Sequence, residues 1–225
     1  QVYQQLIEKQ RALERTQSGE TGHGSREHYA KVADSLDRFV YLEERIELAK
    51  ETLRGEGFYD IDAYRASLFM IDKWLELVSS VYFPTRLTVV DNQFGNYSIY
   101  SSKDLMKVIQ DEAQNPYCSL FRDLFIPSIV KDRPDLIGVS ITATSQIMPG
   151  LTLCKLIKEM APDLHVTIGG SIFTRLVDNV RRCPSLFELC DDIVVFEGET
   201  ALLELVNQLA SKKDYSKVPN LIYRQ

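Results

Sequence analysis

Cysteine and histidine are scarce in this chain of 225 residues, which holds four of the first and three of the second. The cysteines stand at Cys118, Cys154, Cys183 and Cys190. They form neither a disulfide ladder nor paired CxxC motifs for zinc, so we expect reduced thiols in a cytoplasmic protein. His23 and His28 have no third ligand at helical spacing, and we predict no metal site.

The chain also lacks an excess of positive charge and a long uninterrupted apolar run. Its 26 basic residues are outnumbered by 32 acidic ones, and the formal charge of -6 has the wrong sign for binding phosphate backbones. The most apolar long stretch, Ser67 to Phe83, is interrupted by Asp72, Lys73 and Glu76. We therefore expect no nucleic acid and no membrane as partner, and the sequence leaves the oligomeric state open.

Motifs of several enzyme classes are missing as well. The sequence contains no GxGxxG or GxxxxGK[ST] phosphate loop and no GxSxG nucleophile elbow. No base is paired with a nucleophile, so we predict no catalytic residue in this chain. Because the chain opens on Gln1 and closes on Gln225 directly after a strand-like run, we expect it to be part of a longer protein.

Hydrophobic residues make up 44% of the chain, enough for a core without disulfides or metals. Apolar residues recur at three- and four-residue steps in the first third, which predicts a helical N-terminal segment over residues 1–85. The expected helices run from Val2 to Gln17, from about Arg26 to Arg54 and from Asp60 or Asp62 to Phe83. A polar linker, SGETGHGS, separates the first two. The third is apolar almost all round, so we expect other elements on both its sides. The segment is either a docking surface or a structural cover for a sheet edge.

From Arg86 the pattern changes to short apolar strands that alternate with helices. The expected strands are LTVV (87–90), LIGVSIT (136–142), HVTIGG (165–170), DIVVF (192–196) and NLIYR (220–224). From the second strand on, they recur about every 28 residues with helices between them, which is typical of parallel strands joined by crossovers. We predict an α/β domain over residues 86–225, built on an open, doubly wound parallel sheet of the Rossmann or flavodoxin-like kind.

Such sheets bind ligands at the carboxyl ends of their strands. Small and polar residues follow three of the predicted strands there: Thr142 to Gln146, Gly169 to Ser171 and Glu197 to Thr200. These side chains are too short to block a large flat ligand. The plainer interpretations are a tight Gly-Gly turn, an acidic first helical turn and a polar loop.

The same part of the sequence resembles a known family. The segments PDLIGVSITATSQIMPGLTLCKLIKEMAPDLHVTIGGSIFT, DDIVVFEGETALLELVNQLA and KVPNLIYR are similar to the cobalamin (B12)-binding domain that precedes the catalytic barrel of class B radical SAM enzymes. The resemblance covers about residues 117–225, and in a weaker form residues 86–116. In that family the barrel carries a CxxxCxxC motif for a [4Fe-4S] cluster and binds S-adenosylmethionine, and this sequence has no such triplet. The resemblance therefore implies a non-catalytic module whose partner is its own C-terminal barrel.

The resemblance also implies roles for individual residues. Ser140 and Thr142 would line the channel for the dimethylbenzimidazole tail of cobalamin, and Gly169 and Gly170 would leave room for its nucleotide loop. Glu197 and Gly198 would border the tail, and Gln146 would meet the amides of the corrin ring. The complete set of expected cofactor-binding residues is Ser140, Thr142, Thr144, Gln146, Gly169, Gly170, Ser171, Glu197, Gly198 and Glu199.

One departure from related families concerns cobalt. Cobalamin mutases and methionine synthase carry a DxHxxG motif whose histidine is the lower cobalt ligand. The nearest string here, Asp91 to Gly95, has Gln93 in place of the histidine, unless the true first strand lies upstream of Gln1. We therefore expect base-off, His-off cobalamin. The resemblance to radical SAM enzymes implies that this cobalamin takes a methyl group from S-adenosylmethionine and passes it to a substrate radical. The alternatives are a degenerate domain that acts as a scaffold without corrinoid, and a flavodoxin-like domain for another ligand.

Overall fold

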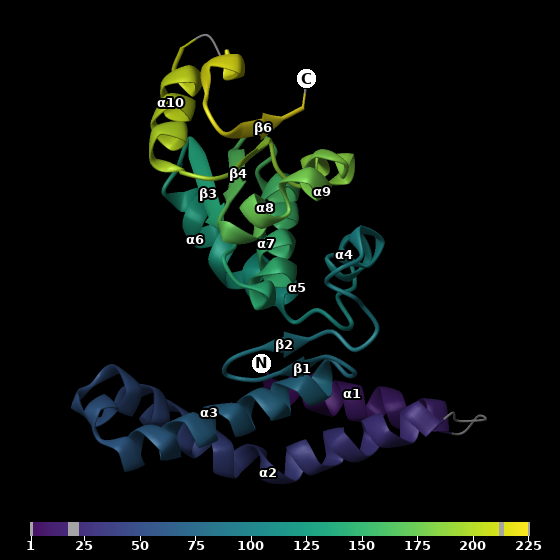
Figure 1. The fold of residues 1–225 in the computed structure, drawn as a ribbon. Coiled ribbons are helices and arrows are strands. Elements are labelled where there is room, and N and C mark those ends of the chain that lie inside the picture. Colours follow the sequence, from purple (N-terminus) through teal and green to yellow (C-terminus); the bar gives the residue numbers. More distant parts are fainter. Residues whose placement is uncertain (1, 18–22, 212–213, 225) are drawn as a thin grey trace. The chain divides into compact units, whose positions relative to one another are not determined.

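The computed structural model of the chain describes residues 2–17, 23–211 and 214–224 (Figure 1). It divides into two compact units, Gln1–Asn96 and Tyr97–Gln225. The predicted polar linker falls largely outside the described residues.

The first unit consists of helices and one small hairpin. Its helices are α1 (Val2–Gln17), α2 (His23–Arg54), a 3-10 turn η1 (Glu56–Tyr59) and α3 (Ile61–Val81). The three helices predicted from apolar periodicity are confirmed. Asp60 is the N-cap of α3, because its carboxylate accepts the backbone N–H groups of Asp62 and Ala63.

The core of the first unit lies between its helices. Its buried side chains come from all three helices and the end of α3: Leu6, Val32, Phe39, Leu42, Leu77, Val81 and Tyr82. The expectation that α3 is covered on both sides is wrong for its first half. Phe69 is 61% exposed and Ile61 58% exposed, and the element that α3 mainly packs on is α2. The exposed Phe69 instead carries the Lys73 ammonium 5.4 Å from its ring centre.

The predicted strand LTVV is replaced by a short hairpin. β1 (Arg86–Leu87) pairs antiparallel with β2 (Asn92–Gln93), and the turn between them is held by Thr88, which exchanges hydrogen bonds with Asp91. The hairpin packs against α3, where the Leu87 N–H donates to the Ser79 hydroxyl at 2.8 Å. Residues 86–96 therefore fold with the helices, and the structure places the boundary after Asn96 instead of at residue 85.

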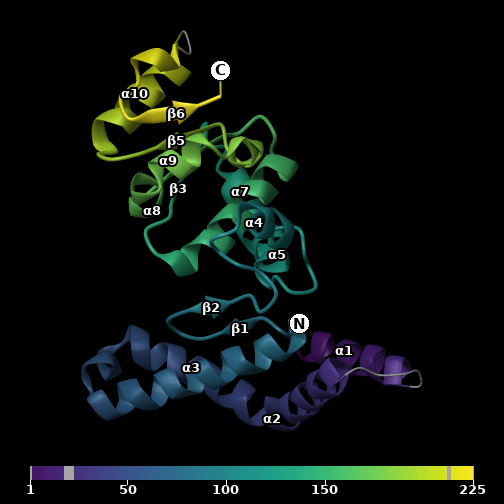
Figure 2. The same cartoon turned by 45° about the vertical axis from the view of Figure 1, so that its right-hand side comes forward.

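The second unit alternates helices and strands, as predicted (Figure 2). Before the sheet come α4 (Ser102–Val108), α5 (Tyr117–Leu120), the π-helical stretch η2 (Phe121–Phe125) and α6 (Ile126–Lys131). The strands are β3 (Leu136–Ser140), β4 (His165–Gly169), β5 (Asp192–Val194) and β6 (Leu221–Tyr223). Between them lie η3 (Thr144–Gln146), α7 (Ile147–Met160), α8 (Ser171–Arg175), α9 (Val177–Arg181), η4 (Pro184–Glu188), α10 (Glu199–Leu209) and η5 (Tyr215–Lys217).

The sheet differs from the predicted one in its last strand and in its order. β3, β4 and β5 are parallel, whereas β6 pairs antiparallel with β5, Leu221 opposite Val194. The segment after α10 is long enough to return to the carboxyl end of β5 before β6 begins, and Asn220 turns the chain there with a φ of 57°. The order β3-β4-β5-β6 follows the sequence, so the described sheet is α/β and mainly parallel but has no point where the strand order reverses.

Helices cover both faces of the sheet. α10 packs on one face, where Ala201 and Leu205 meet Val194 of β5. α7 packs on the other, since a Cβ on Gly150 would lie 3.8 Å from Val139 of β3. Alternate residues of a strand point to the same face, so the register places Gly138, Ser140, Thr167 and Gly169 on the side of α10. This face carries the candidate site.

Candidate functional site at the carboxyl edge of the sheet

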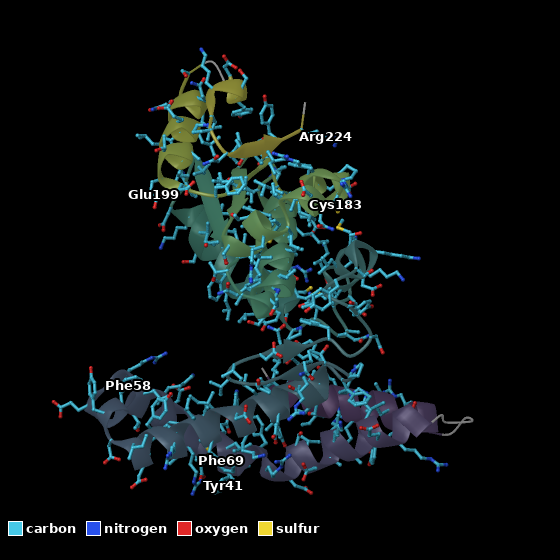
Figure 3. The ribbon with its side chains drawn as sticks, in the orientation of Figure 1. Tyr41, Phe58, Phe69, Cys183, Glu199 and Arg224 are labelled. Atoms are coloured by element: carbon cyan, nitrogen blue, oxygen red, sulfur yellow. The ribbon has the colours of Figure 1, made fainter. Side chains whose placement is uncertain are left out.

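The structure gathers the predicted residues at the carboxyl ends of β3, β4 and β5. Ser140 is in register with Gly169, and the Ser171 hydroxyl donates to the Thr142 carbonyl at 3.1 Å. The predicted side chains are exposed, apart from the half-buried glycines: Ser140, Thr142, Thr144, Gln146, Ser171, Glu197 and Glu199 (Figure 3 labels Glu199). None of the predicted side chains at this edge is bulky, and the exposed aromatic ring of Phe196 lies directly before Glu197.

The side chain of Gln146 forms hydrogen bonds within this rim. Its side-chain oxygen accepts hydrogen bonds from the Thr142 N–H at 2.8 Å, the Thr142 hydroxyl at 3.1 Å and the Ala143 N–H at 3.1 Å. These bonds fix the loop between β3 and α7. Gln146 therefore orients the rim through its oxygen, whereas the sequence suggested a direct contact with the corrin amides.

Gly170 is required by the local backbone conformation. Its φ of 109° and ψ of 165° lie in a region that only glycine adopts readily. A Cβ there would stand 2.3 Å from the carbonyl oxygen of Ile141, which accepts the Ile172 N–H. The space next to Gly170 is thus filled by the backbone after β3, and the residue does not leave the room for a ligand that the resemblance implied.

At three other glycines a Cβ would fit without a clash. A Cβ on Gly169 would meet Val194 at ordinary distances of 3.6 and 4.0 Å, and one on Gly198 would meet it at 3.9 Å. A Cβ on Gly138 would touch only a methyl group of Thr167, at 3.7 Å. Gly138 is exposed although it lies in the middle of a strand, because β3 is the edge strand of the described sheet. The α10 face is therefore bare backbone at Gly138 and Gly169, beside the Ser140 hydroxyl.

Two buried polar atoms on this face have no hydrogen-bond partner among the described residues. They are the Thr167 hydroxyl and one carboxylate oxygen of Asp192, and both side chains are under 5% exposed. Thr167 lies next to Gly138 on one side and Asp192 on the other. An unsatisfied buried polar atom costs about 1–3 kcal/mol, so the pair lowers the stability of the second unit.

Sequence reasoning missed Gly138, Thr167 and Asp192. The signal for Gly138 was available, since a glycine inside an apolar strand often marks a close approach of another group to the backbone. The unsatisfied hydroxyl of Thr167 had no signal, because it depends on which strands are neighbours.

A polar cluster occupies the opposite, amino edge. His165 Nε2 lies 2.7 Å from an Asp192 carboxylate oxygen, and the Lys158 ammonium lies 3.0 and 3.1 Å from the two oxygens of Asp191. Asp191 also accepts the Val166 N–H at 2.7 Å. These contacts hold the starts of β4 and β5 together.

Comparisons with known proteins bear on the second unit. Residues 103–206 match the B12 binding domain. The match begins in α4, ends in α10 and includes all predicted rim residues, so it supports a cobalamin-binding module in this part of the chain and implies a Rossmann-like fold there. Searches among curated proteins and among solved structures gave no significant match.

The string that resembled the DxHxxG motif lies outside this B12-binding match. Asp91 to Gly95 belongs to the hairpin of the first unit, and Gln93 is a residue of β2. It is therefore not the loop of a strand in the four-stranded sheet. The sequence places one histidine in the second unit, His165, and it stands at the amino edge bound to Asp192. The rim of the B12-binding match thus offers no histidine.

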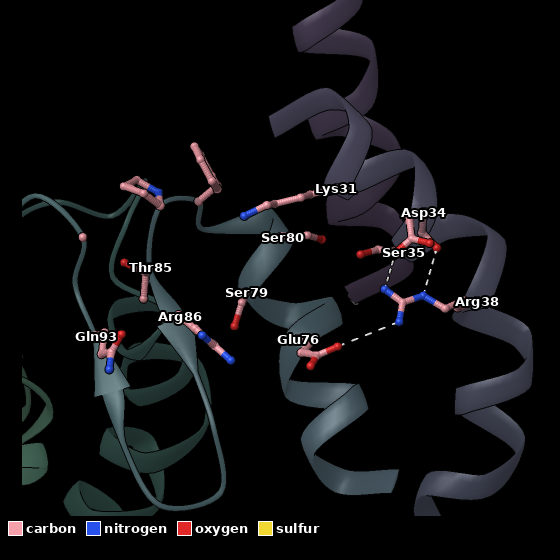
Figure 4. A pocket seen from close by; sticks show the side chains of 13 residues that line it. Lys31, Asp34, Ser35, Arg38, Glu76, Ser79, Ser80, Thr85, Arg86 and Gln93 are labelled. Carbon is pink, nitrogen blue, oxygen red and sulfur yellow. Dashed lines mark hydrogen bonds and ion pairs between the residues drawn. The ribbon is translucent and has the colours of Figure 1, made fainter. Parts of the chain in front are cut away.

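The first unit has a polar cavity of its own, of about 400 Å³ between α2, α3 and the hairpin (Figure 4). Lys31, Arg38, Arg86 and Glu76 line it. Arg38 pairs with Asp34 and lies 3.9 Å from Glu76, so much of the charge in the cavity is already neutralised within the protein. We therefore assign a structural role to the charged residues of this cavity, because the Arg38–Glu76 contact joins α2 to α3.

Metal and membrane sites were also sought. No group of three His, Cys, Asp or Glu side chains in the described ranges is placed to hold a metal ion. None of the helices in those ranges is long and apolar enough to cross a membrane.

Proposed function

We propose that residues 97–225 bind cobalamin at the carboxyl edge of the sheet and act as a cofactor module. The observation that carries this proposal is the bare backbone at Gly138 and Gly169 on the α10 face, within the segment that matches the B12 binding domain. A large neutral corrinoid needs hydrogen-bonding groups without bulk, which short hydroxyls and glycine backbone provide. Bound cobalamin supplies a cobalt centre that can accept a methyl group and pass it on.

The residues of the rim take different parts in this proposal. Ser140 and Thr142 present their hydroxyls to the nucleotide tail, and Gly169 leaves room for it beside Val194. Glu197 and Gly198 border the tail at the start of α10. Thr144, Ser171 and Glu199 follow the same strand ends and are candidates for the corrin amides.

We propose that the cobalamin is bound base-off and His-off. The support is the position of His165, which lies at the amino edge with its Nε2 on Asp192. A cob(II)alamin complex should then show an EPR spectrum without nitrogen splitting on the cobalt lines. A spectrum split by one nitrogen would refute this part of the proposal.

We further propose that the parent protein is a cytoplasmic radical SAM enzyme, in which a C-terminal barrel binds a [4Fe-4S] cluster and S-adenosylmethionine for methyl transfer. The support is the order and spacing of the IGVS, IGG and EGE segments. The gene sequence beyond Gln225 tests this directly, since a CxxxCxxC triplet is required there.

Cobalamin binding itself is testable on the chain as it stands. The protein is mixed with hydroxocobalamin, free ligand is removed by gel filtration, and the visible spectrum is recorded. Ser140→Trp and Gly138→Val should abolish the retained absorbance, because each places a side chain on the open α10 face. Asp163→Trp, in the exposed turn before β4 at the amino edge, is the matched control and should bind as the unmodified chain does.

No retained absorbance, or equal retention by Ser140→Trp and Asp163→Trp, would contradict the proposal. It would favour the second candidate function, a scaffold domain without corrinoid. One observation favours that candidate: α10 exposes the apolar side chains of Leu202, Leu203 and Val206, which suit the surface of a protein partner.

A further inference from the structure

A second cavity in the same unit lies on the side of α7, α8 and α9. It has a volume of about 460 Å³ and opens between α4, the start of α7 and α9. Its deepest residues are apolar and less than 10% exposed: Ile147, Leu151, Ile172, Phe173, Val180 and Leu186. It shares only Thr144 with the predicted corrinoid edge, so it is a separate site.

One charged side chain lines this cavity. Arg182 lines it and forms no ion pair among the described residues, whereas Arg38 and Arg122 elsewhere in the chain are paired with carboxylates. Ser102 and Asn179 add hydrogen-bonding groups beside it. An apolar interior below a lone guanidinium is complementary to a molecule with an apolar body and one anionic end.

We propose that this cavity binds a small organic anion, whose aromatic or branched aliphatic body fills the apolar interior and whose carboxylate pairs with Arg182. Ligand cavities commonly have volumes of about 300–1,000 Å³, and this one falls inside that range. The proposal does not depend on cobalamin, because the cavity and the glycines of the rim lie on different faces of the sheet.

Cys183 gives the site a built-in reporter. It lines the cavity and is half-buried, whereas the other three cysteines are buried (Cys183 is labelled in Figure 3). Burial raises the pKa of Cys118 to about 11 and that of Cys154 to about 12, and it raises the pKa of Cys190 as well. Iodoacetamide should therefore alkylate Cys183 first, at a rate that mass spectrometry can follow.

The test compares 4-phenylbutyrate with the neutral 4-phenylbutyramide, which has nearly the same shape. Binding is measured by calorimetry, and occupancy by the slowing of Cys183 alkylation. The acid should bind about tenfold tighter than the amide and protect Cys183, because only the acid pairs with the guanidinium. Leu176→Trp, which fills the mouth from an exposed position, should abolish binding of both compounds.

Adjacent arginines provide the matched control. Arg182→Gln should remove the tenfold preference for the acid, whereas Arg181→Gln should leave it unchanged, because Arg181 is exposed and does not line the cavity. The proposal is overturned if the acid fails to bind, if it binds no tighter than the amide, or if the two arginine variants behave alike. Circular dichroism of each variant verifies that it is folded.

Discussion

Replacing either of two neighbouring glycines of the rim, Gly169 or Gly170, by alanine adds one methyl group, and the structure predicts different effects of the two substitutions on stability. Gly170→Ala forces a Cβ into a backbone conformation with a φ of 109° and to within 2.3 Å of the Ile141 carbonyl oxygen. Residues held in such conformations cost about 1–3 kcal/mol, and the contact with a backbone atom cannot be relieved by rotating a side chain. We expect the free energy of unfolding to fall by about 3 kcal/mol, at the upper end of that range.

Gly169→Ala adds the same methyl group one residue earlier. There the new Cβ would lie 3.6 Å from the Val194 oxygen, an ordinary contact, and the backbone is that of a strand. Because glycine in a strand is less stable than alanine by roughly 0.5–1 kcal/mol, the variant should be as stable as the unmodified chain or slightly more so. It should nevertheless weaken cobalamin binding, since the methyl group occupies part of the open face.

Urea unfolding separates these outcomes. Far-UV circular dichroism follows both units, and the fluorescence of Trp74, the one tryptophan of the chain, reports on the first unit. The Gly170→Ala transition should move to lower urea in the circular dichroism signal while the Trp74 transition stays in place. Equal stability of the two alanine variants would refute the explanation given for Gly170.

Three further predictions concern buried polar groups. Thr167→Val should raise the free energy of unfolding by about 1 kcal/mol, because it removes a hydroxyl that has no hydrogen-bond partner among the described residues. Thr152→Val should lower the free energy of unfolding, because the Thr152 hydroxyl accepts from Asn115 and donates to the Met148 carbonyl. Changes of the opposite sign in urea unfolding would contradict both predictions. Burial lowers the pKa of His28 below 6.5, so the unfolded state binds more protons than the folded state. The stability of the first unit should therefore fall as the pH drops below about 6.5. The fall, followed by Trp74 fluorescence, should be smaller in His28→Gln. Lys158→Met should destabilise the second unit by about 1–3 kcal/mol, as it leaves the half-buried Asp191 without its ammonium; an unchanged urea midpoint would show that the pair is too solvated to contribute.

Much of the local structure was readable in the sequence. The helices of the first unit followed from the apolar spacing, and the strands and helices of the second from short apolar runs separated by turn residues. Asp60 was recognisable as one of two candidate helix starts, because a side chain that caps a helix lies next to it in the chain. The edge of the sheet on which Ser140, Gly169 and Glu197 gather was also predictable, since parallel strands end on one side.

The errors arose where two strands of similar sequence have different neighbours. LTVV and NLIYR both satisfy the apolar pattern of a parallel strand, yet the first forms a hairpin with Asn92 and Gln93 and the second pairs antiparallel with β5. Hydrophobicity and β-branching determine that a segment is extended, but hydrogen-bond partners come from segments distant in the chain.

The amino-acid sequence by itself determined the elements, their order and the residues at the rim, because periodicity and turn chemistry act over a few residues. Only the tertiary structure decided what each rim residue does. Gly169 and Gly170 are the same residue type, yet a Cβ on Gly169 would make only ordinary contacts with Val194, whereas one on Gly170 would collide with the backbone of Ile141. The same holds for the lone charge of Arg182 above an apolar cavity. Such properties depend on which atoms of remote segments fill the neighbouring space, and no local pattern records that.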